Sequence, residues 1–347
     1  MEANPTAVSG RFLLVACRGG AESELVRRQE AVLPQVRKGA WRRGVVTFRL
    51  DPPGQPPFDP PPDFFPDLVF ARACIRSLGQ VTAADDAARA QAAFAMAGAG
   101  PWQNAHVWLR DARVAADVEA IRGRLLAAAG ITAVSPIASP GDLVLDCVVD
   151  SPERWWVGWH RAATPPSTWP GGVYPGGLSP TAVSRAWLKL DEAVATFGLP
   201  LERGQRAVEL GAAPGGASQR LLEAGLDVVG IDPALVDPVV AAHPRFTQWR
   251  KRARDVKLRE FRGFDWIVCD MNIDPVSTME SLGRIVTAPG VRPRGIVATL
   301  KLPEWSRAAA LPEWLAAFRS WGFRPQARQL STGGRELCVT ATRSQGA

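Results

Sequence analysis

The sequence has few of the features that mark secreted, membrane-spanning or metal-binding proteins. Its five cysteines are scattered and never stand in CxxC spacing, which argues against a disulfide framework or a zinc knuckle and favours a reducing cytoplasm. No apolar run is long enough for a transmembrane helix, and the first ten residues lack the basic start and apolar block of a secretory signal. The three histidines have no metal-ligand spacing, so we expect no bound metal. Because no apolar run is long enough, we also expect no membrane partner.

Lysine is also scarce, since only five of the 41 basic residues are lysines. A lysine in an apolar setting of this chain therefore calls for an explanation. The 347 residues are 46% hydrophobic and 22% charged, which excludes a wholly disordered chain and predicts two or three globular domains.

The basic charge lies mainly in the second half of the chain. Residues 1–180 carry 18 basic and 17 acidic side chains, whereas residues 181–347 carry 23 and 17. A basic C-terminal half suggests a polyanionic partner, nucleic acid first. An arginine-rich proteome would explain the same excess, and the charge alone does not separate the two.

Two proline-rich segments divide the chain. Eight of the 16 residues at 51–66 are prolines, and residues 164–180 are again rich in proline and glycine. Such segments favour extended linkers or loops. We therefore predict an N-terminal ferredoxin-like α/β unit at 1–55, a small α+β module at 67–163 whose first strand is Leu68 to Ala71, a linker at 164–180, and a third domain at 181–347.

The third domain alternates strands and helices, which predicts an α/β fold with a doubly wound, mostly parallel sheet. Its first strand runs into a glycine-rich turn, ELGAAPGG, and a second strand ends at Asp232 about 20 residues later. An acid at that strand end can bind the two hydroxyls of a ribose. The turn departs from GxGxxG and holds a proline where a pyrophosphate needs amide donors. This favours S-adenosylmethionine over a dinucleotide.

Four ionisable residues stand in conspicuous settings. Lys189 lies in an amphipathic helix before the glycine-rich turn, Asp270 and Lys301 each follow an apolar strand, and Glu336 begins another. Because ligands of such sheets collect at the carboxyl ends of the strands, Asp270 and Lys301 should share the cofactor crevice. A lysine oriented by a carboxylate there could take a proton from a sugar hydroxyl that attacks a methyl group.

Five ordered motifs resemble the FtsJ-type ribose 2′-O-methyltransferases, a Rossmann-like family that uses S-adenosylmethionine and a Lys-Asp-Lys-Glu tetrad. They are SRAWLKLDEA, ELGAAPGG, WIVCDM, ATLKLP and RELCV. The resemblance implies that Lys189, Asp270, Lys301 and Glu336 are the tetrad, with Lys301 as general base. The cofactor positions that it implies, together with the turn glycine, are Gly211, Ala213, Pro214, Gly215, Gly216, Asp232 and Asp270.

The order of the parts is similar to one subgroup of that family, bacterial enzymes that methylate a cytidine of 23S ribosomal RNA. FLLVACRGG near the N-terminus and LVFARA at 68–73, in a module that would be THUMP-like and RNA-binding, carry this part of the resemblance. This resemblance implies that the partner is ribosomal RNA, in the form of a large-subunit precursor. It also implies a monomeric, cytoplasmic enzyme that needs no metal.

Two departures from the family pattern leave alternatives open. Arg252 stands where an acid commonly contacts the adenine, so either Asp255 substitutes or stacking and backbone contacts hold the ring. Ala217 stands where an aromatic is common.

The segment 248–262, with seven basic and two acidic residues, is either a phosphate-contacting rim or a solvated helix face. A non-catalytic RNA-binding or assembly factor on a methyltransferase scaffold, or a methyltransferase for another RNA, are the rival hypotheses.

Overall fold

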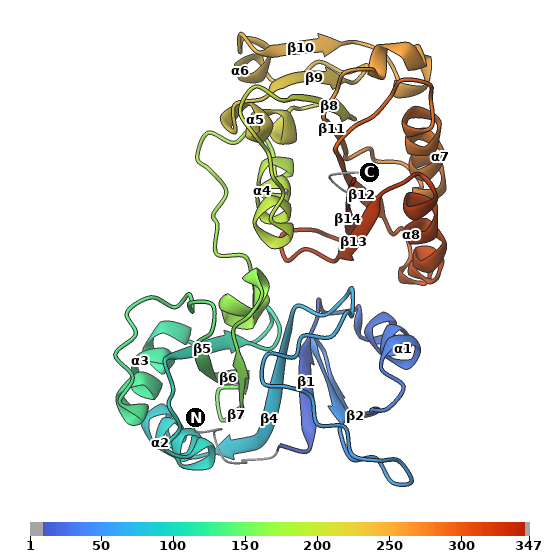
Figure 1. Ribbon diagram of the computed structural model, residues 1–347. Coiled ribbons are helices and arrows are strands. Elements are labelled where there is room, and N and C mark those ends of the chain that lie inside the picture. Colours follow the sequence, from blue (N-terminus) through green and yellow to red (C-terminus); the bar gives the residue numbers. More distant parts are fainter. Residues whose placement is uncertain (1–9, 344–347) are drawn as a thin grey trace. The chain divides into compact units, whose positions relative to one another are not determined.

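The computed structural model describes residues 10–343 and contains two compact units, 1–175 and 176–347 (Figure 1). Each unit is built on its own seven-stranded sheet. The division between the units falls within the predicted 164–180 linker. Among the described residues, no helix combines the length and apolar character needed to cross a membrane.

The first unit is an α+β structure with strand order β2-β3-β1-β4-β7-β6-β5. Only β5 and β6 are parallel, and every other neighbouring pair is antiparallel. Its elements are β1 (Phe12–Ala16), α1 (Glu22–Val32), β2 (Arg37–Arg42), β3 (Val45–Arg49), β4 (Ala73–Thr82), α2 (Asp86–Ala97), β5 (Asn104–Leu109), α3 (Val118–Ala129), β6 (Leu143–Ser151), β7 (Arg154–Arg161) and the 3-10 turns η1 (Pro165–Thr168) and η2 (Pro170–Gly172).

The segments before and after the proline-rich stretch 51–66 belong to one sheet, although the sequence analysis separates them. β1 pairs with β3 on one side and with β4 on the other, so a strand from each predicted domain borders it. The proline-rich stretch itself lies against this unit, because the amide of Arg161 donates to the carbonyl of Pro62. Residues 1–55 and 67–163 therefore share a sheet. The predicted strand Leu68–Ala71 is a turn, and the strand begins at Ala73.

Helices α2 and α3 cover one face of this sheet and enclose an apolar core with β5, β6 and β7. Asp85 and Asp117 begin the two helices, each accepting a backbone N–H three residues on, which satisfies a donor that the first helical turn leaves open. The other face holds a second core that includes Trp108, Val148 and Trp156.

The second unit is the doubly wound, mostly parallel sheet that the sequence predicts, with strand order β10-β9-β8-β11-β12-β14-β13. Its elements are α4 (Ala186–Phe197), β8 (Arg206–Leu210), α5 (Gly216–Glu223), β9 (Asp227–Ile231), α6 (Pro238–Ala241), β10 (Phe246–Trp249), η3 (Ala253–Asp255), η4 (Leu258–Phe261), β11 (Trp266–Cys269), α7 (Pro275–Val286), β12 (Gly295–Lys301), η5 (Trp305–Ala310), α8 (Leu311–Ser320), β13 (Arg324–Arg328) and β14 (Glu336–Thr342).

The strand order reverses between β8 and β11, which lie side by side although β9 and β10 separate them in sequence. Strands β8 to β12 are parallel, and β14 is inserted antiparallel beside β12. Helices α4 and α5 lie on one side of the sheet and α7 and α8 on the other (Figure 1). In open α/β sheets, the carboxyl ends of the strands at such a reversal form the ligand-binding crevice.

Candidate active site

The four predicted tetrad residues meet at this edge of the second sheet. Nζ of Lys301 donates to Oδ1 of Asp270 at 2.8 Å and to Oε2 of Glu336 at 2.7 Å. Nζ of Lys189 donates to Oδ2 of Asp270 at 2.5 Å and lies 3.4 Å from Oε1 of Glu336. These contacts close a ring in which two ammonium groups alternate with two carboxylates. We call these four residues the tetrad.

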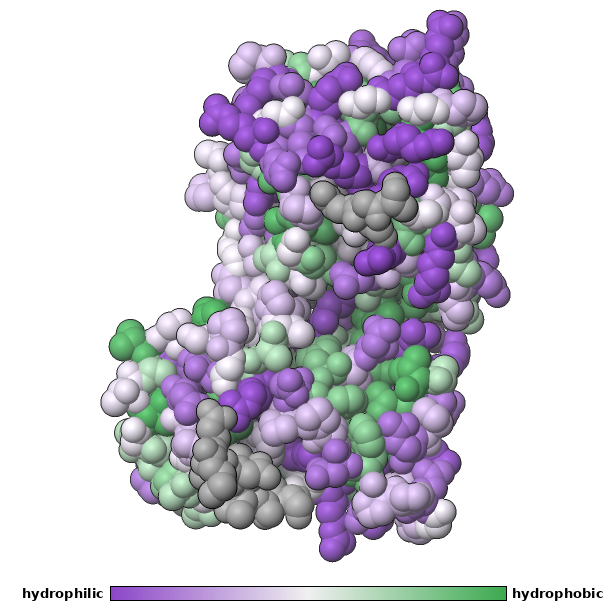
Figure 2. Space-filling view, in the orientation of Figure 1, coloured by the Kyte–Doolittle hydropathy of each residue, from purple (hydrophilic) through white to green (hydrophobic). Residues whose placement is uncertain are grey.

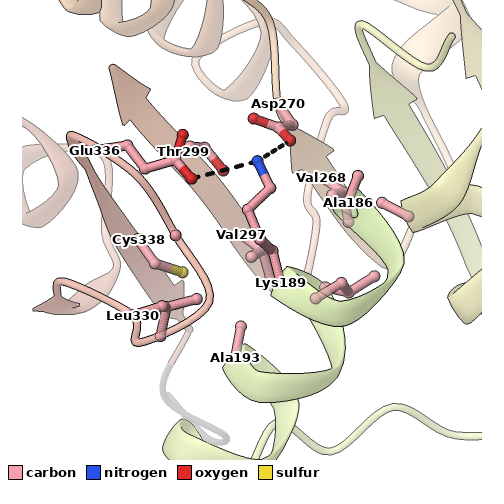
Figure 3. A pocket seen from close by; sticks show the side chains of 13 residues that line it. Ala186, Lys189, Ala193, Val268, Asp270, Val297, Thr299, Leu330, Glu336 and Cys338 are labelled. Atoms are coloured by element: carbon pink, nitrogen blue, oxygen red, sulfur yellow. Dashed lines mark hydrogen bonds and ion pairs between the residues drawn. The ribbon is translucent and has the colours of Figure 1, made fainter. Parts of the chain in front are cut away.

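Strand ends and strand register bring the tetrad together. Asp270 directly follows β11, and Lys301 is the last residue of β12. Glu336 is the first residue of β14 and the direct partner of Lys301 in the antiparallel β12–β14 ladder. Lys189 reaches the site from the first turn of α4, and Figure 3 shows its side chain extending toward Asp270 and Glu336.

The ring fixes the charge state of its members. Burial raises the pKa of the Asp270 carboxyl, but Lys189 and Lys301 outweigh burial, so this pKa lies below its ordinary value. Burial also raises the pKa of Glu336, but Lys189 and Lys301 again outweigh it, so this pKa lies below its ordinary value. Burial lowers the pKa of Lys301, whereas Asp270 and Glu336 raise it further, so the net pKa is above its ordinary value. At neutral pH Lys301 is therefore an ammonium between two carboxylates.

An apolar pocket adjoins the tetrad (Figure 3). A largely apolar wall strengthens the electrostatic interactions beside it. The pocket places the ion pairs at the boundary between an apolar interior and the strand ends. Besides three tetrad residues, its lining includes Ala186, Ala193, Ala217, Val268, Val297, Leu330 and Cys338.

The predicted cofactor turn connects β8 to α5. Gly211 has φ +81° and lies so close to the chain after β11 that a Cβ there would meet Met271 at 2.9 Å, so a side chain does not fit. Gly215, at φ +113°, is the N-cap of α5, and no side chain caps that helix. The first amide groups of α5 can therefore serve a ligand held in the turn.

Asp232 directly follows β9, across from this turn. Its Oδ2 accepts the amide of Ala213 at 3.1 Å and its Oδ1 accepts the amide of Ala234 at 2.8 Å. Each carboxylate oxygen can accept a second hydrogen bond. Asp232, which is half-buried, therefore holds the turn in place and retains acceptor capacity toward a ligand.

Glu209 and Ser218 form a buried pair beneath the turn that the sequence analysis did not identify. Oγ of Ser218 donates to Oε2 of Glu209 at 2.5 Å, and both residues are fully buried. Burial raises the pKa of Glu209 to about 8, so this carboxyl is mostly protonated at neutral pH. An acid in the middle of an apolar strand, next to the ELGAAPGG turn, was the available signal.

Glu192 is a second residue that the sequence analysis did not single out. This buried side chain of α4 accepts the amides of Ser331 and Thr332 at 2.7 and 2.8 Å and the hydroxyl of Thr332 at 2.6 Å. It thereby attaches the loop between β13 and β14 to the helix that carries Lys189. That loop leads directly into Glu336. Its only sequence signal is its place in the LKLDEA motif.

The basic segment 248–262 contains no α-helix, so the helix-face interpretation is wrong. It runs from the carboxyl end of β10 to the amino end of β11 through the short turns η3 and η4. All seven of its basic side chains are exposed, and Figure 2 shows mostly hydrophilic residues on the surface around β10. The amide of Asp232 donates to the carbonyl of Trp249, so the first basic residues of the segment follow directly beside the predicted cofactor site.

Fold and site together define a Rossmann-like α/β unit that carries a glycine-rich turn, an acid at a strand end and a charged tetrad at its strand-order reversal. Residues 182–301, all of them in the second unit, match the family model described as FtsJ-like methyltransferase. The match includes Lys189, Asp270 and Lys301 and ends before Glu336.

Two similar curated proteins are both named "Ribosomal RNA large subunit methyltransferase M". That of Halorhodospira halophila is 35% identical over 190 residues, 52% of each chain, and that of Thauera aminoaromatica is 38% identical over 154 residues, 42% of this chain and 41% of its own. The chain thus matches about half the length of these relatives. Among solved structures, TrmN from Thermus thermophilus is similar at 15% identity, with a TM-score of 0.34 over 96% of this chain and 99% of its own.

Proposed function

We propose that this protein methylates RNA on a ribose 2′-hydroxyl with S-adenosylmethionine, and that its target is a cytidine of 23S ribosomal RNA. The closed tetrad at the strand-order reversal is the observation that carries this proposal. It joins a lysine that can hold a hydroxyl proton to two carboxylates that orient that lysine. The names of the similar proteins support ribosomal RNA as the substrate.

The residues at the cofactor edge fit S-adenosylmethionine. The side-chain-free turn at Gly211, the uncapped start of α5 and the carboxylate of Asp232 offer amide donors and a ribose-binding acid without a phosphate cradle. Ala213, Pro214, Gly215 and Gly216 would line the methionine side, with Asp270 beside them. When bound, S-adenosylmethionine supplies a methyl group on a positively charged sulfur. The adenine would be held either by Asp255 in place of an acid at Arg252, or by stacking and backbone contacts, and both stay predictions.

Lys301 moves the proton in this proposal. Because Lys301 is an ammonium in the described arrangement, it must release one proton to the solvent before it can accept another from the 2′-hydroxyl. A positive charge brought close to a lysine lowers its pKa, so a filled cofactor site favours that release. Asp270 and Glu336 hold Nζ in position, and Lys189 balances their charge.

The first unit, the basic segment and the cellular setting complete the proposal. We assign RNA recruitment to the first unit, as a THUMP-like module, and salt-dependent phosphate contacts to the exposed arginines and lysines of 248–262. The enzyme would act as a cytoplasmic monomer and would need no metal for methyl transfer.

The test is a pair of substitutions at Lys301. We expect Lys301→Ala to abolish methyl transfer to RNA while binding of S-adenosylmethionine, measured by calorimetry, survives. Lys301→Arg retains the positive charge but cannot release a proton, so it should be as inactive as the alanine variant. Full activity of Lys301→Ala would refute the role of Lys301, and an active Lys301→Arg would show that charge alone is required.

Because Arg252 stands where the family commonly has an acid, one alternative is also tested: a scaffold that binds RNA without catalysing methyl transfer. Radiolabelled S-adenosylmethionine, supplied with ribosomal RNA and precursor particles from cells that lack the protein, separates the candidates. Label resistant to alkali at one large-subunit nucleotide supports ribose methylation there. Cofactor binding without label indicates another RNA, and absence of cofactor binding indicates the non-catalytic scaffold.

A further inference from the structure

Two of the three histidines meet an aspartate inside the first unit, far in sequence from any residue of the proposed reaction. His106 of β5, Asp146 of β6 and His160 of β7 lie on adjacent strands, and all three are buried. His106 is the direct register partner of Asp146, and one potential ligand atom of each residue lies within 4.8 Å of the others. We call these three residues the histidine cluster.

The surroundings orient two of the three side chains. Nε2 of His160 lies 2.8 Å from the carbonyl of Ser167, so this nitrogen carries a hydrogen and donates it. The opposite nitrogen, Nδ1, faces Oδ2 of Asp146 at 2.5 Å. The indole of Trp108 donates to the remaining oxygen, Oδ1, at 3.3 Å. Metal-ligating histidines are typically held in this way, with the far nitrogen donating to a backbone carbonyl.

His106 supplies the second, independent observation. It is 0% exposed, and neither of its ring nitrogens has a hydrogen-bond partner among residues 10–343. A neutral imidazole ring carries one free lone pair that can bind a metal ion. Leaving a buried polar group unpaired destabilises the folded state. An electron-pair acceptor within the histidine cluster would give the lone pair of His106 a partner.

We propose that the histidine cluster binds a zinc ion through one ring nitrogen of His106, Oδ2 of Asp146 and Nδ1 of His160. The ion takes the place of the hydrogen between Nδ1 and Oδ2, and that proton leaves to the solvent. Two nitrogens and one oxygen are ligands that zinc favours, whereas calcium and magnesium prefer oxygen alone. The ion would connect the three strands β5, β6 and β7 at one face of the sheet. The site is structural and separate from the methyl-transfer residues, so it does not depend on the proposed function.

Tetrahedral zinc takes four ligands, so a water molecule would complete the three that the histidine cluster supplies. No further histidine, cysteine, aspartate or glutamate joins the histidine cluster within the described part of the chain. A small crevice lined by the prolines at 60–62 and by Cys74 reaches His160 from one side. Ligands around tetrahedral zinc stand about 3.3 Å apart, so the 2.5 Å contact between His160 and Asp146 should widen when the ion binds.

The experiment uses the full, untagged chain. Its metal content is measured after purification without chelators, and Zn²⁺ alone is then titrated into chelator-treated protein by calorimetry. We expect one zinc per chain. His106→Gln and Asp146→Asn should weaken zinc binding by at least about tenfold, since even indirect contacts to a metal cost that much. His243→Gln, which changes the histidine outside the cluster, should leave zinc binding unchanged.

Two results would overturn the proposal. Wild-type protein that neither contains nor binds zinc would leave His160 and Asp146 as a plain imidazolium–carboxylate pair. Zinc that binds equally well to folded His106→Gln would lie elsewhere. If the variants do not fold, anomalous diffraction from wild-type crystals decides the matter, because the ion must lie about 2.0–2.2 Å from all three ligand atoms.

Discussion

The two sheets each hold a cluster of charged and ionisable side chains, but at different places. In the second unit the tetrad stands at the ends of β11 and β12, and its side chains are 12–21% exposed. In the first unit the histidine cluster lies in the interior of the strands, where the side chains of His160 and Asp146 are 10% and 1% exposed. A parallel sheet collects several strand ends at one edge, where a substrate can reach them. In the first unit the histidine cluster is enclosed within the sheet instead, so we expect it to serve the fold.

The largest expected effect is a loss of methyl transfer when the central acid of the tetrad is replaced, which no change in the histidine cluster should cause. Asp270→Asn takes a charge from the residue that holds both Lys189 and Lys301, so we expect methyl transfer to fall by about 10³-fold or more. Asp191→Asn is the control, because Asp191 pairs with Arg220 in the same unit but outside the tetrad. Initial rates of label transfer measure both. Equal losses in the two variants would mean that Asp270 has only a structural role.

The corresponding change in the first unit should affect stability instead. Asp146→Asn removes the acceptor of His160 and Trp108, and breaking a buried charged pair costs about 3–5 kcal/mol. We expect the unfolding transition of the first unit to move to lower denaturant concentration. Calorimetric binding of S-adenosylmethionine to the second unit should be unchanged. Loss of cofactor binding together with stability would contradict the independence of the two clusters.

Glu209 gives the second unit its own pH-dependent stability. Its pKa is raised from 4.5 to about 8 on folding, so the folded state binds the extra proton between these values. The stability that this group contributes is present below about pH 4.5 and is lost as the pH rises toward 8. The slope is at most about 1.4 kcal/mol per pH unit. Denaturant unfolding at several pH values should show a smaller slope for Glu209→Gln than for wild type, and parallel curves would refute the raised pKa.

The smallest expected effect concerns the basic segment. Arg250→Ala removes one exposed charge beside the cofactor edge, so RNA affinity should fall modestly. The salt dependence of binding should lose about one unit of slope, as for one released counterion. Arg319→Ala, an exposed arginine near the end of α8, is the matched control. Equal salt slopes for Arg250→Ala and wild type would remove this segment from the RNA interface.

The sequence allowed the tetrad to be predicted because each of three residues stands at the end of an apolar strand. Asp270, Lys301 and Glu336 are visible as charges next to buried runs, and the fold class then places them on one edge. Lys189 could be predicted from its motif and from the scarcity of lysine in the chain. Nothing local distinguished Glu192, because its role depends on a loop about 140 residues away.

The first unit was harder to predict because strand pairing decides its structure. β2, with sequence RKGAWR, is exposed at every position, so it carries no alternation of apolar and polar residues and resembles a basic turn. The joint sheet across the proline-rich stretch depends on β1 pairing with β4, and the histidine cluster depends on register among β5, β6 and β7. Neither contact leaves a local signal in the sequence.

The position of Glu336 on β14 has a consequence for synthesis of the protein. Ribosomes release the N-terminal part of a chain first, and Lys189, Asp270 and Lys301 emerge well before the strand that completes their ring. Until β14 inserts between β12 and β13, Lys301 lacks one of its two acceptors. A prematurely terminated translation product that ends before β14 has only three residues of the tetrad. If methyl transfer requires the whole tetrad, as we propose, it becomes possible only when β14 has been made and paired.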